Sequence, residues 1–394
     1  MRHVERESRR VIAREPGADE RPILITGGAG FIGCNVAHRL LSSGQRVRVL
    51  DNLSRSGVER NLRWLRDTHG DLLEAEIADI RDVPAVRRAV HGVRQVFHFA
   101  AQVAVTTSLE DPAHDFTVNA RGTLNLLEAV REQDDPPPLV YTSTNKVYGG
   151  LDDVCLTESD ERYEPADDVV RQNGISERRR LDFHSPYGCS KGTADQYVLD
   201  YARSFGLKTA VFRMSCIYGP QQYGTEDQGW VAHFLIQAIE GRPIMLYGDG
   251  KQVRDLLFVE DLVNAMLLAQ RSMRTIAGQA FNIGGGAGNT VSLLELLDLI
   301  ADIGGERPDV AFHDWRVGDQ RYYVSDTAKF GAATGWAPTV DVERGVERLY
   351  RWLVDSGTAA AVRRLTRRTR RVETEDVSAV AGAREALIAE GRRT

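Results

Sequence analysis

Short apolar runs alternate with segments of helical spacing through the first half of the chain. After the first run, for example, apolar residues recur at Ile32, Val36 and Leu40, which is the spacing of one helix face. Strands that alternate with helices favour right-handed crossovers and a parallel sheet. The pattern therefore predicts an α/β fold with a Rossmann-type, doubly wound parallel sheet. The predicted strands are 23–25, 47–50, 96–99, 139–141 and 210–212, and further helices are predicted at 119–131 and from about Tyr187.

The pattern becomes less regular in the second half of the chain. A polar insertion occupies residues 151–183, and from Gly219 onward short segments alternate with Gly and Pro residues. Such segments predict a smaller C-terminal substrate-binding lobe, built by insertions between further sheet elements. We expect one folded unit over residues 22–355, with the sheet mainly in 22–218 and the lobe mainly in 219–355.

Both ends of the chain differ in composition from this unit. Residues 1–21 are rich in Arg and Glu and have no apolar core, which excludes a signal peptide or a membrane span in this stretch. We expect a disordered leader or an expression remnant there. Residues 356–394 form an Arg-rich tail with six arginines between 363 and 371. Such a tail is usually a solvated helix or a disordered extension without a binding role. The alternative is that its arginines bind an anionic surface.

Composition points to small-molecule partners. The 394 residues, 42% of them hydrophobic, are enough to bury a sizeable core. A formal net charge of −6 gives no reason to expect a nucleic acid as partner. The four cysteines form no CxxC pair, and histidines such as His98 and His184 have no metal-ligand spacing. We therefore expect no metal site, no disulfide framework and no membrane partner, and a reducing, cytoplasmic location.

A glycine-rich turn joins the first predicted strand to the first predicted helix, in the sequence Thr-Gly-Gly-Ala-Gly-Phe-Ile-Gly at 26–33. A strand, such a turn and a helix together can hold a pyrophosphate on the backbone N–H groups of the helix start. Gly27 allows the tight turn, Gly30 lets the backbone approach the phosphates, and Gly33 permits close packing of helix on strand. The turn predicts a dinucleotide site.

Asp51 supports this prediction, because it follows the second predicted strand at roughly the 20-residue distance that dinucleotide folds show. A carboxylate at this place accepts hydrogen bonds from the ribose and repels a 2′-phosphate, so it favours NAD over NADP as the cofactor. Arg55 could offset part of that repulsion. The alternative to a dinucleotide site is that the glycine turn has only a structural role and that Asp51 follows the strand by chance.

Tyr187 and Lys191 occupy one face of a predicted helix, because they are four residues apart. An ammonium near the phenol favours the phenolate, so Tyr187 could exchange a proton with a sugar hydroxyl while hydride moves to the nicotinamide. Hydroxyls at 142–144 could hold the substrate oxygen beside the phenol. The pair alone is also compatible with a structural role, and the glycine turn, Asp51 and the hydroxyls favour chemistry.

These motifs together resemble the extended short-chain dehydrogenase/reductase family from about Pro22 to Leu353, through TGxxGxxG, YxxxK and the segment 254–261. The resemblance implies that Thr144 is the catalytic hydroxyl, Tyr187 the acid/base and Lys191 the residue that tunes it. It also implies a homodimer packed through two helices per subunit. The further NAD contacts that it implies are Phe31, Ile32, Asn52, Arg55, Asp79, Ile80, Phe99, Ala100, Ala101 and Asn119, the last of which could instead be structural.

Asn145 and Lys146 follow the threonine, where sugar 4,6-dehydratases of this family carry an Asp-Glu pair that expels water. An amide and an ammonium do not readily replace that pair, so an epimerase is favoured. Such an enzyme oxidises a carbinol with tightly held NAD and returns the hydride to the opposite face. The segments most similar to the CDP-paratose 2-epimerases, also called CDP-tyvelose epimerases, are 143–149, 185–191, 224–230 and 314–321.

A nucleotide-diphosphate sugar is the substrate that this resemblance implies. Arg254 and Arg316 could clamp its diphosphate, since guanidinium forks match phosphate oxygens, or could make surface ion pairs. Cys216 stands where many relatives carry an Asn and cannot make the amide's hydrogen bonds, so the nucleotide stays open among CDP, UDP and GDP. The other residues expected near the substrate are Gln102, Thr144, Asn145, Lys146, Gln228 and Trp230.

Two alternatives are kept beside the epimerase. Lys146 or Glu226 could act as a base, and the reaction would then end in dehydration or net dehydrogenation. A sensor or scaffold that binds NAD without turnover is the second, since a fold alone does not establish catalysis. Such a protein would be expected to lose Tyr187 or Lys191, and both are present.

Overall fold

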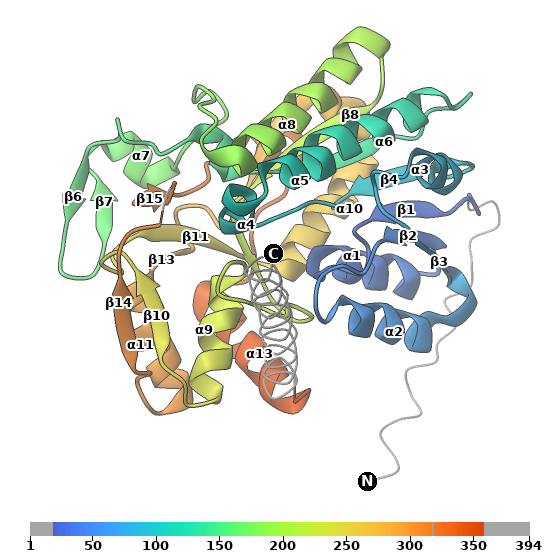
Figure 1. The fold of residues 1–394 in the computed structure, drawn as a ribbon. Helices are drawn as coiled ribbons and strands as arrows, with labels where there is room; N and C mark the ends of the chain where they lie inside the picture. Colours follow the sequence, from blue (N-terminus) through green and yellow to red (C-terminus); the bar gives the residue numbers. More distant parts are fainter. Residues whose placement is uncertain (1–18, 317, 358–394) are drawn as a thin grey trace, which may run out of the picture.

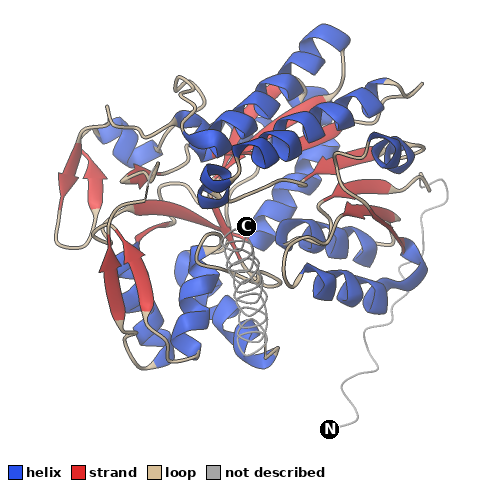
Figure 2. Cartoon of the chain, viewed as in Figure 1, coloured by secondary structure: helices blue, strands red, loops and turns tan. Residues whose placement is uncertain are grey.

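A seven-stranded parallel sheet forms the centre of the protein (Figures 1 and 2). The computed structural model describes residues 19–316 and 318–357. Each neighbouring pair of strands in the sheet is parallel and helices cover both faces, so the predicted Rossmann-type, doubly wound sheet is confirmed. In order across the sheet, the strands are β12 (Gln279–Ile283), β8 (Thr209–Met214), β5 (Leu139–Thr144), β4 (Gln95–His98), β1 (Ile23–Thr26), β2 (Val47–Asp51) and β3 (Leu73–Ile77).

The central strands bury hydrophobic side chains on both faces, because successive residues of a strand point to opposite sides. In β1, Ile23 and Ile25 pack into one core, whereas Leu24 packs into a second core behind the sheet. The helices of the first core are α1 (Phe31–Ser42), α2 (Val58–His69), α10 (Val259–Ile276) and α12 (Ala328–Thr334). The helices of the second core are α3 (Val83–Val90), α6 (Gly122–Arg131) and α8 (Ser185–Phe205).

Several elements of the sheet region, β12 among them, were not individually predicted or differ in their bounds. Strand β3 was not predicted, because Glu74 and Glu76 alternate with its apolar residues and none of its residues is buried at this edge of the sheet. The helix predicted over 119–131 begins at Gly122, after a wider π-type turn, η2 (Thr117–Arg121). A short 3-10 turn, η1 (Gly70–Leu72), connects α2 to β3.

A third hydrophobic core lies in the C-terminal part of the chain. It joins helices α9, α11 and α13 to a pair of parallel strands and includes Phe234, Leu246 and Leu349. Its elements are α9 (Trp230–Ile239), β10 (Ile244–Tyr247), α11 (Leu293–Gly304), β14 (Val310–His313) and α13 (Val342–Asp355). Between this lobe and the central sheet lies a small sheet of β9 (Cys216–Tyr218), β11 (Val253–Phe258), β13 (Thr290–Ser292) and β15 (Tyr322–Tyr323).

The polar insertion at 151–183 contains a hairpin and a short helix at one side of the molecule (Figure 1). Leu151 and Ile175 pack there with Tyr148 and Tyr323 in a separate small core. The elements of the insertion are β6 (Leu156–Glu158), β7 (Tyr163–Pro165) and α7 (Asp168–Asn173). Two short helices outside the insertion, α4 (Val105–Glu110) and α5 (Pro112–Phe116), precede α6 in the chain.

Most of both predicted terminal segments lies outside the described residues, including the arginines between 363 and 371. Arg21, the last residue of the predicted leader, is described, and its carbonyl oxygen accepts a 3.0 Å hydrogen bond from the Arg94 guanidinium. Within 19–316 and 318–357, no helix combines the length and the apolar composition that a membrane crossing requires.

Candidate active site

A cavity of about 670 Å³ opens at the carboxyl ends of β1, β2, β4, β5 and β8. The strand order reverses between β1 and β4, and ligands of open α/β sheets bind at such a point. All residues predicted to contact the cofactor line this cavity except Asn119. Among those predicted near the substrate, Gln102, Thr144, Asn145 and Gln228 line it, and Lys146, Trp230, Arg254 and Arg316 do not.

The glycine turn is packed too closely for side chains. Gly27 has a φ of +69°, and a Cβ on it would lie 2.7 Å from the backbone nitrogen of Ala100. A Cβ on Gly33 would lie 2.3 Å from the carbonyl oxygen of Gly27, so only glycine lets α1 start this close to β1. Gly30 is the N-cap of α1, and no side chain caps the helix, so the backbone N–H groups at its start can bind a phosphate.

Asp51 is fixed at the end of β2 by backbone donors. Its Oδ2 accepts from the Ala29 N–H at 3.0 Å, and its Oδ1 accepts from the Leu53 N–H at 2.9 Å. Burial raises the pKa of this carboxyl, and the backbone hydrogen bonds oppose that shift. Nearby, the Asn52 amide donates to Asp79 at 2.9 Å. NAD requires uncapped helix N–H groups as donors, a glycine cradle, and a strand-end carboxylate as the acceptor for its ribose, so these residues fit the cofactor.

A buried network supports the β4 end of the cavity. His98 is fully buried, with Nδ1 2.6 Å from Thr26 Oγ1 and Nε2 2.9 Å from Thr123 Oγ1. Burial lowers the pKa of His98 to about 3, so the ring is neutral. The Ala100 N–H in turn donates to Thr26 Oγ1 at 3.3 Å. His98 thereby ties β1, β4 and α6 together beneath the backbone that lines the cavity.

Tyr187 and Lys191 project from the first turns of α8 into the cavity, and both side chains are buried. The Lys191 ammonium donates to the Thr142 carbonyl at 2.6 Å, and burial lowers its pKa to about 7. Burial raises the pKa of Tyr187 to about 12, and the nearby Thr144 hydroxyl opposes part of the shift. The expected lowering of the phenol's pKa by Lys191 is therefore absent, because desolvation of the phenolate dominates.

Thr144 ends β5 and caps the short 3-10 turn η3 (Asn145–Tyr148). Its Oγ1 lies 3.2 Å from Asn145 Oδ1 and accepts from the Lys146 N–H at 3.2 Å. The Lys146 side chain leaves the cavity, donates to the Gly318 carbonyl at 3.0 Å and lies 3.7 Å from Asp319. Asn145 and Lys146 thus connect the end of β5 to the segment around 318–320.

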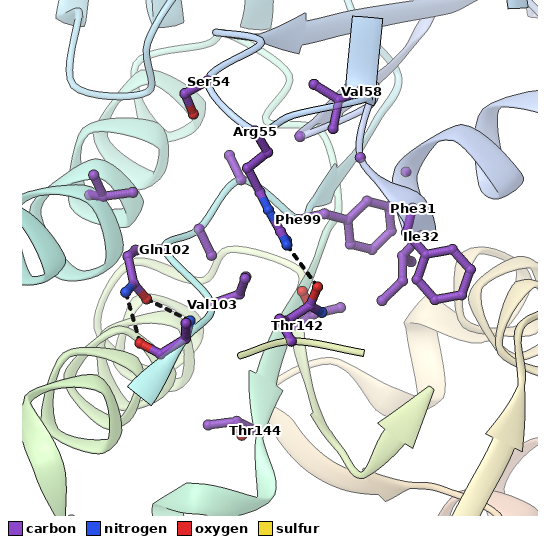
Figure 3. Close-up of a pocket in the computed structure, with 18 of the residues that line it drawn as sticks. Phe31, Ile32, Ser54, Arg55, Val58, Phe99, Gln102, Val103, Thr142 and Thr144 are labelled. Carbon is purple, nitrogen blue, oxygen red and sulfur yellow. Dashed lines mark hydrogen bonds between the residues drawn. The ribbon is translucent and has the colours of Figure 1, made fainter. Parts of the chain in front are cut away.

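The side chains at the cavity wall include two polar groups with protein partners (Figure 3). Arg55 donates a 2.8 Å hydrogen bond to Gln228 Oε1, which links the loop after β2 to the C-terminal lobe. The Gln102 carboxamide folds back on the Ala104 backbone, with hydrogen bonds of 2.8 and 2.9 Å. Gln102 therefore shapes the loop after β4.

The two arginines predicted to clamp a diphosphate have different surroundings. Arg254 is 7% exposed and donates to Asp319 at 2.7 Å and to the Gln320 carbonyl at 2.5 Å. Arg316 is more exposed, donates to Glu226 Oε1 at 3.0 Å and lies 3.8 Å from the centre of the Tyr247 ring. Both are bound to carboxylates rather than free.

Two other predicted residues, Trp230 and Asn119, also have clear partners. The indole N–H of Trp230 points to the sulfur of Cys216 at 3.4 Å, so the two residues form one wall of the lobe. Asn119 is buried in η2, where its amide binds the Gln102 backbone and Ser190 Oγ. Because Asn119 does not line the cavity, its place fits the structural alternative rather than direct cofactor contact.

Sequence reasoning gave no role to Gln320, Asp319 or Tyr247, although all three contact predicted site residues. Gln320 is fully buried and binds Asn145 at 3.1 Å. The one feature of the sequence that could have pointed to Gln320 is its position inside the segment 314–321, which resembles the CDP-paratose 2-epimerases. No group of three or more His, Cys, Asp or Glu side chains that could hold a metal is found among residues 19–316 and 318–357.

Known proteins share this arrangement. The chain matches the NAD dependent epimerase/dehydratase family over residues 23–284. It is 46% identical over 339 residues to the CDP-paratose 2-epimerase of Salmonella typhi, covering 84% of this chain and 98% of that protein. It is 31% identical over 354 residues to dTDP-glucose 4,6-dehydratase 1 of Escherichia coli K12, covering 85% and 93%.

The solved structure of UDP-glucose 4-epimerase from Thermus thermophilus, in complex with NAD, is similar with a TM-score of 0.70 and 33% identity. That likeness covers 84% of this chain and 99% of that chain. Fold and sequence agree over most of the length. The chain therefore belongs to the NAD dependent epimerase/dehydratase family, within the extended short-chain dehydrogenases/reductases, and its cofactor is NAD.

Proposed function

We propose that the chain is an NAD-dependent epimerase of a nucleotide-diphosphate sugar. The observation that carries this proposal is the meeting of Thr144, Tyr187 and Lys191 at the NAD cavity, with Asn145 and Lys146 in place of an acid pair. Dehydration needs a general acid to expel water, and Asn145 cannot transfer a proton while the Lys146 side chain points to Gly318. Oxidation and return of hydride need no such pair.

Each residue has a defined task in this reaction. Bound NAD supplies the acceptor and later the donor of hydride. Tyr187 would act from its ionised form, which the positive charge of bound NAD beside it would favour. The phenolate takes the carbinol proton as the C–H bond is oxidised, and the phenol returns that proton when the opposite face is reduced. Thr144 holds the reacting oxygen beside the phenol. Lys191, fixed on the Thr142 carbonyl, places a positive charge at the buried centre. Substrate and product have equal mass, and no external reductant is consumed.

A CDP-linked sugar is the substrate class that we favour, with CDP-paratose as the first compound to test. The support is the 46% identity to the CDP-paratose 2-epimerase of Salmonella typhi over nearly the full length of that protein. Segments 224–230 and 314–321, which resemble that group in sequence, come together through the Glu226–Arg316 contact.

Purified protein with NAD should convert one member of a panel of CDP-, UDP- and GDP-sugars into its epimer. Proton NMR detects the new diastereomer, and mass spectrometry shows whether mass is conserved. Tyr187→Phe should reduce turnover by about 10²–10⁴-fold, the usual contribution of a general acid/base. A product that is lighter than the substrate by one water would identify a dehydratase instead, and a product that is lighter by two hydrogens would identify a dehydrogenase. If none of these nucleotide sugars is converted, the proposed activity is wrong.

We also propose a homodimer in the cytoplasm. Four large apolar side chains are exposed on α4, α5 and α8: Leu109, Phe116, Tyr197 and Phe205. A second copy that packs helices against this face would cover them. The four cysteines are free thiols, which suits a reducing compartment. Light scattering measures the mass in solution, and a Tyr197→Glu, Phe205→Glu variant should be monomeric.

A further inference from the structure

The segment 220–228 runs along the cofactor cavity between β9 and α9. Its first residues are fastened to the cofactor half of the protein. The Asn35 amide of α1 donates to the Pro220 carbonyl at 3.0 Å, and the Asn61 amide of α2 donates to the Gln221 carbonyl at 3.3 Å. Both amides also bind carbonyl oxygens at the glycine turn and at the start of α1. The first part of the segment therefore keeps its place beside the turn.

The last part of the segment is a tight turn over residues 225–228. The Thr225 N–H donates to the Gln228 carbonyl at 2.9 Å, and the Gln228 N–H donates to the Thr225 carbonyl at 3.2 Å. Gly229 follows as the N-cap of α9, with a φ of +82°. Glycine adopts other backbone conformations at low cost, so the turn can rotate about Gly229 while the helix stays in place.

A side-chain hydrogen bond joins this turn to the loop after β2. Arg55 Nη2 donates to Gln228 Oε1 at 2.8 Å, and Figure 3 shows the Arg55 side chain extended among the residues that line the cavity. The same cavity is lined by Asp51, which fits the ribose of NAD, and by Tyr187. The Arg55–Gln228 link therefore connects two walls of the cavity in which the cofactor fits.

The C-terminal lobe holds the turn from its other side. The Arg316 guanidinium donates to the Glu226 carbonyl at 3.1 Å and to Glu226 Oε1 at 3.0 Å. These contacts keep the turn with the lobe when the link to Arg55 breaks. The turn and the loop after β2 can therefore separate as two units.

We propose that the Arg55–Gln228 hydrogen bond is a latch on the cofactor cavity, and that the turn 225–228 swings away from Arg55 when NAD enters or leaves. The contacts of the segment differ in how easily they open. Asn61 is fully buried, whereas Arg55 is exposed, so water competes for the hydrogen bond of Arg55 and not for that of Asn61. The segment opens at its last part and stays fastened at its first.

The benefit of such a latch rests on the proposed epimerase function. An epimerase oxidises and reduces the same molecule, so loss of the cofactor between the two steps strands the ketone. A closed latch holds the cofactor until the hydride has returned. A dehydrogenase, by contrast, must exchange its cofactor in every turnover.

The release of NADH tests the latch without any sugar. Protein loaded with NADH is mixed with excess NAD, and the loss of energy transfer from tryptophan gives the dissociation rate. Gln228→Leu removes the link and should release NADH about three- to tenfold faster, the effect of one hydrogen bond of ordinary net strength. The link closes the cavity with or without cofactor, so association should accelerate equally. The dissociation constant from fluorescence titration should therefore stay within about twofold of the wild-type value.

A double-mutant cycle shows whether Gln228 acts through Arg55. In an Arg55→Met background, Gln228→Leu should cause no further acceleration, because the link is already lost. Arg63→Met, which removes an exposed arginine of α2, is the matched control and should release NADH at the wild-type rate.

An unchanged release rate in Gln228→Leu would overturn the proposal. A dissociation constant that rises as much as the release rate would also overturn it, since Gln228 would then bind the cofactor directly rather than control its passage. If release accelerates as expected but no nucleotide sugar is converted, the latch stands and the proposed function fails.

Discussion

The Nζ of Lys191 lies 2.6 Å from the carbonyl oxygen of Thr142, and the backbone of β5 thereby holds the end of the side chain. The ammonium also lies 4.4 Å from the centre of the Tyr141 ring. These contacts compensate only part of the hydration that the ammonium loses, since Lys191 is 4% exposed. Burial accordingly lowers the pKa of Lys191 to about 7.

Lys191 should therefore change charge within the physiological pH range. In protein labelled with ¹³C at the lysine ε carbons, one resonance should titrate with a midpoint near pH 7 and be missing in Lys191→Met. Free lysine in the same buffers is the reference, since lysines in water titrate near pH 10.4. A Lys191 resonance with a midpoint above pH 9 would show that the site stabilises the cation, contrary to the burial argument.

Gly33 should tolerate no side chain. The Cβ of Gly33→Ala would lie 2.3 Å from the Gly27 carbonyl oxygen and 2.7 Å from the Gly28 Cα, and both atoms belong to the backbone. Helix α1 must then move away from the turn, which should lower the free energy of unfolding by about 1–3 kcal/mol. The same shift moves the N–H groups at the helix start, so NAD should bind at least about tenfold more weakly.

Urea denaturation and calorimetric titration with NAD measure these two effects. Gly288→Ala is the matched control, because no atom lies within 4 Å of the Cβ it would introduce. Equal NAD affinity in Gly33→Ala and wild type would mean that the turn adapts without moving the helix.

Local signals in the sequence located the cofactor half of the site, but the substrate half depends on contacts between distant segments. The glycine turn, Asp51 and the Tyr187 helix belong to motifs with a characteristic spacing along the chain, so that spacing predicts their geometry. Asn145 meets Gln320 across 175 residues. Nothing in a polar pair such as Asn145-Lys146 indicates which distant groups it will bind, because a hydrogen bond across the fold leaves no periodicity.

His98 should make the folded state sensitive to acid. Burial lowers its pKa to about 3 in the fold, against 6.5 as the ordinary value. Between these two values the unfolded chain binds more protons than the folded protein, so the free energy of unfolding falls as the pH decreases from 6.5 towards 3. The contribution approaches about 1.4 kcal/mol per pH unit.

Urea denaturation at pH 7, 6, 5 and 4 tests this contribution. His98→Gln should be less stable than wild type at pH 7, because it disturbs the contacts with Thr26 and Thr123, but its stability should depend less on pH. His91→Gln, at an exposed position, should keep the wild-type slope. Parallel slopes for His98→Gln and wild type would assign the acid sensitivity to carboxylates instead.

Glu226 should compete with the substrate for Arg316. Its carboxylate accepts from the Arg316 guanidinium at 3.0 Å, and the Tyr247 hydroxyl donates to the same oxygen. If Arg316 binds the diphosphate, as its guanidinium predicts, the ligand must displace this carboxylate or share the guanidinium with it. Glu226→Gln weakens the internal ion pair and should therefore strengthen the binding of CDP, whereas Arg316→Ala should weaken it.

The size of the gain is bounded by the exposure of the pair, since both side chains are partly in contact with water. Exposed ion pairs contribute up to about 1 kcal/mol, so Glu226→Gln should improve the dissociation constant of CDP by no more than about fivefold, and less at high salt. Isothermal titration with CDP at low and high salt measures both effects, and Glu306→Gln, an exposed carboxylate of the same lobe, is the control. Should Glu226→Gln weaken CDP binding as much as Arg316→Ala does, the carboxylate orients the arginine for the ligand rather than competing with it.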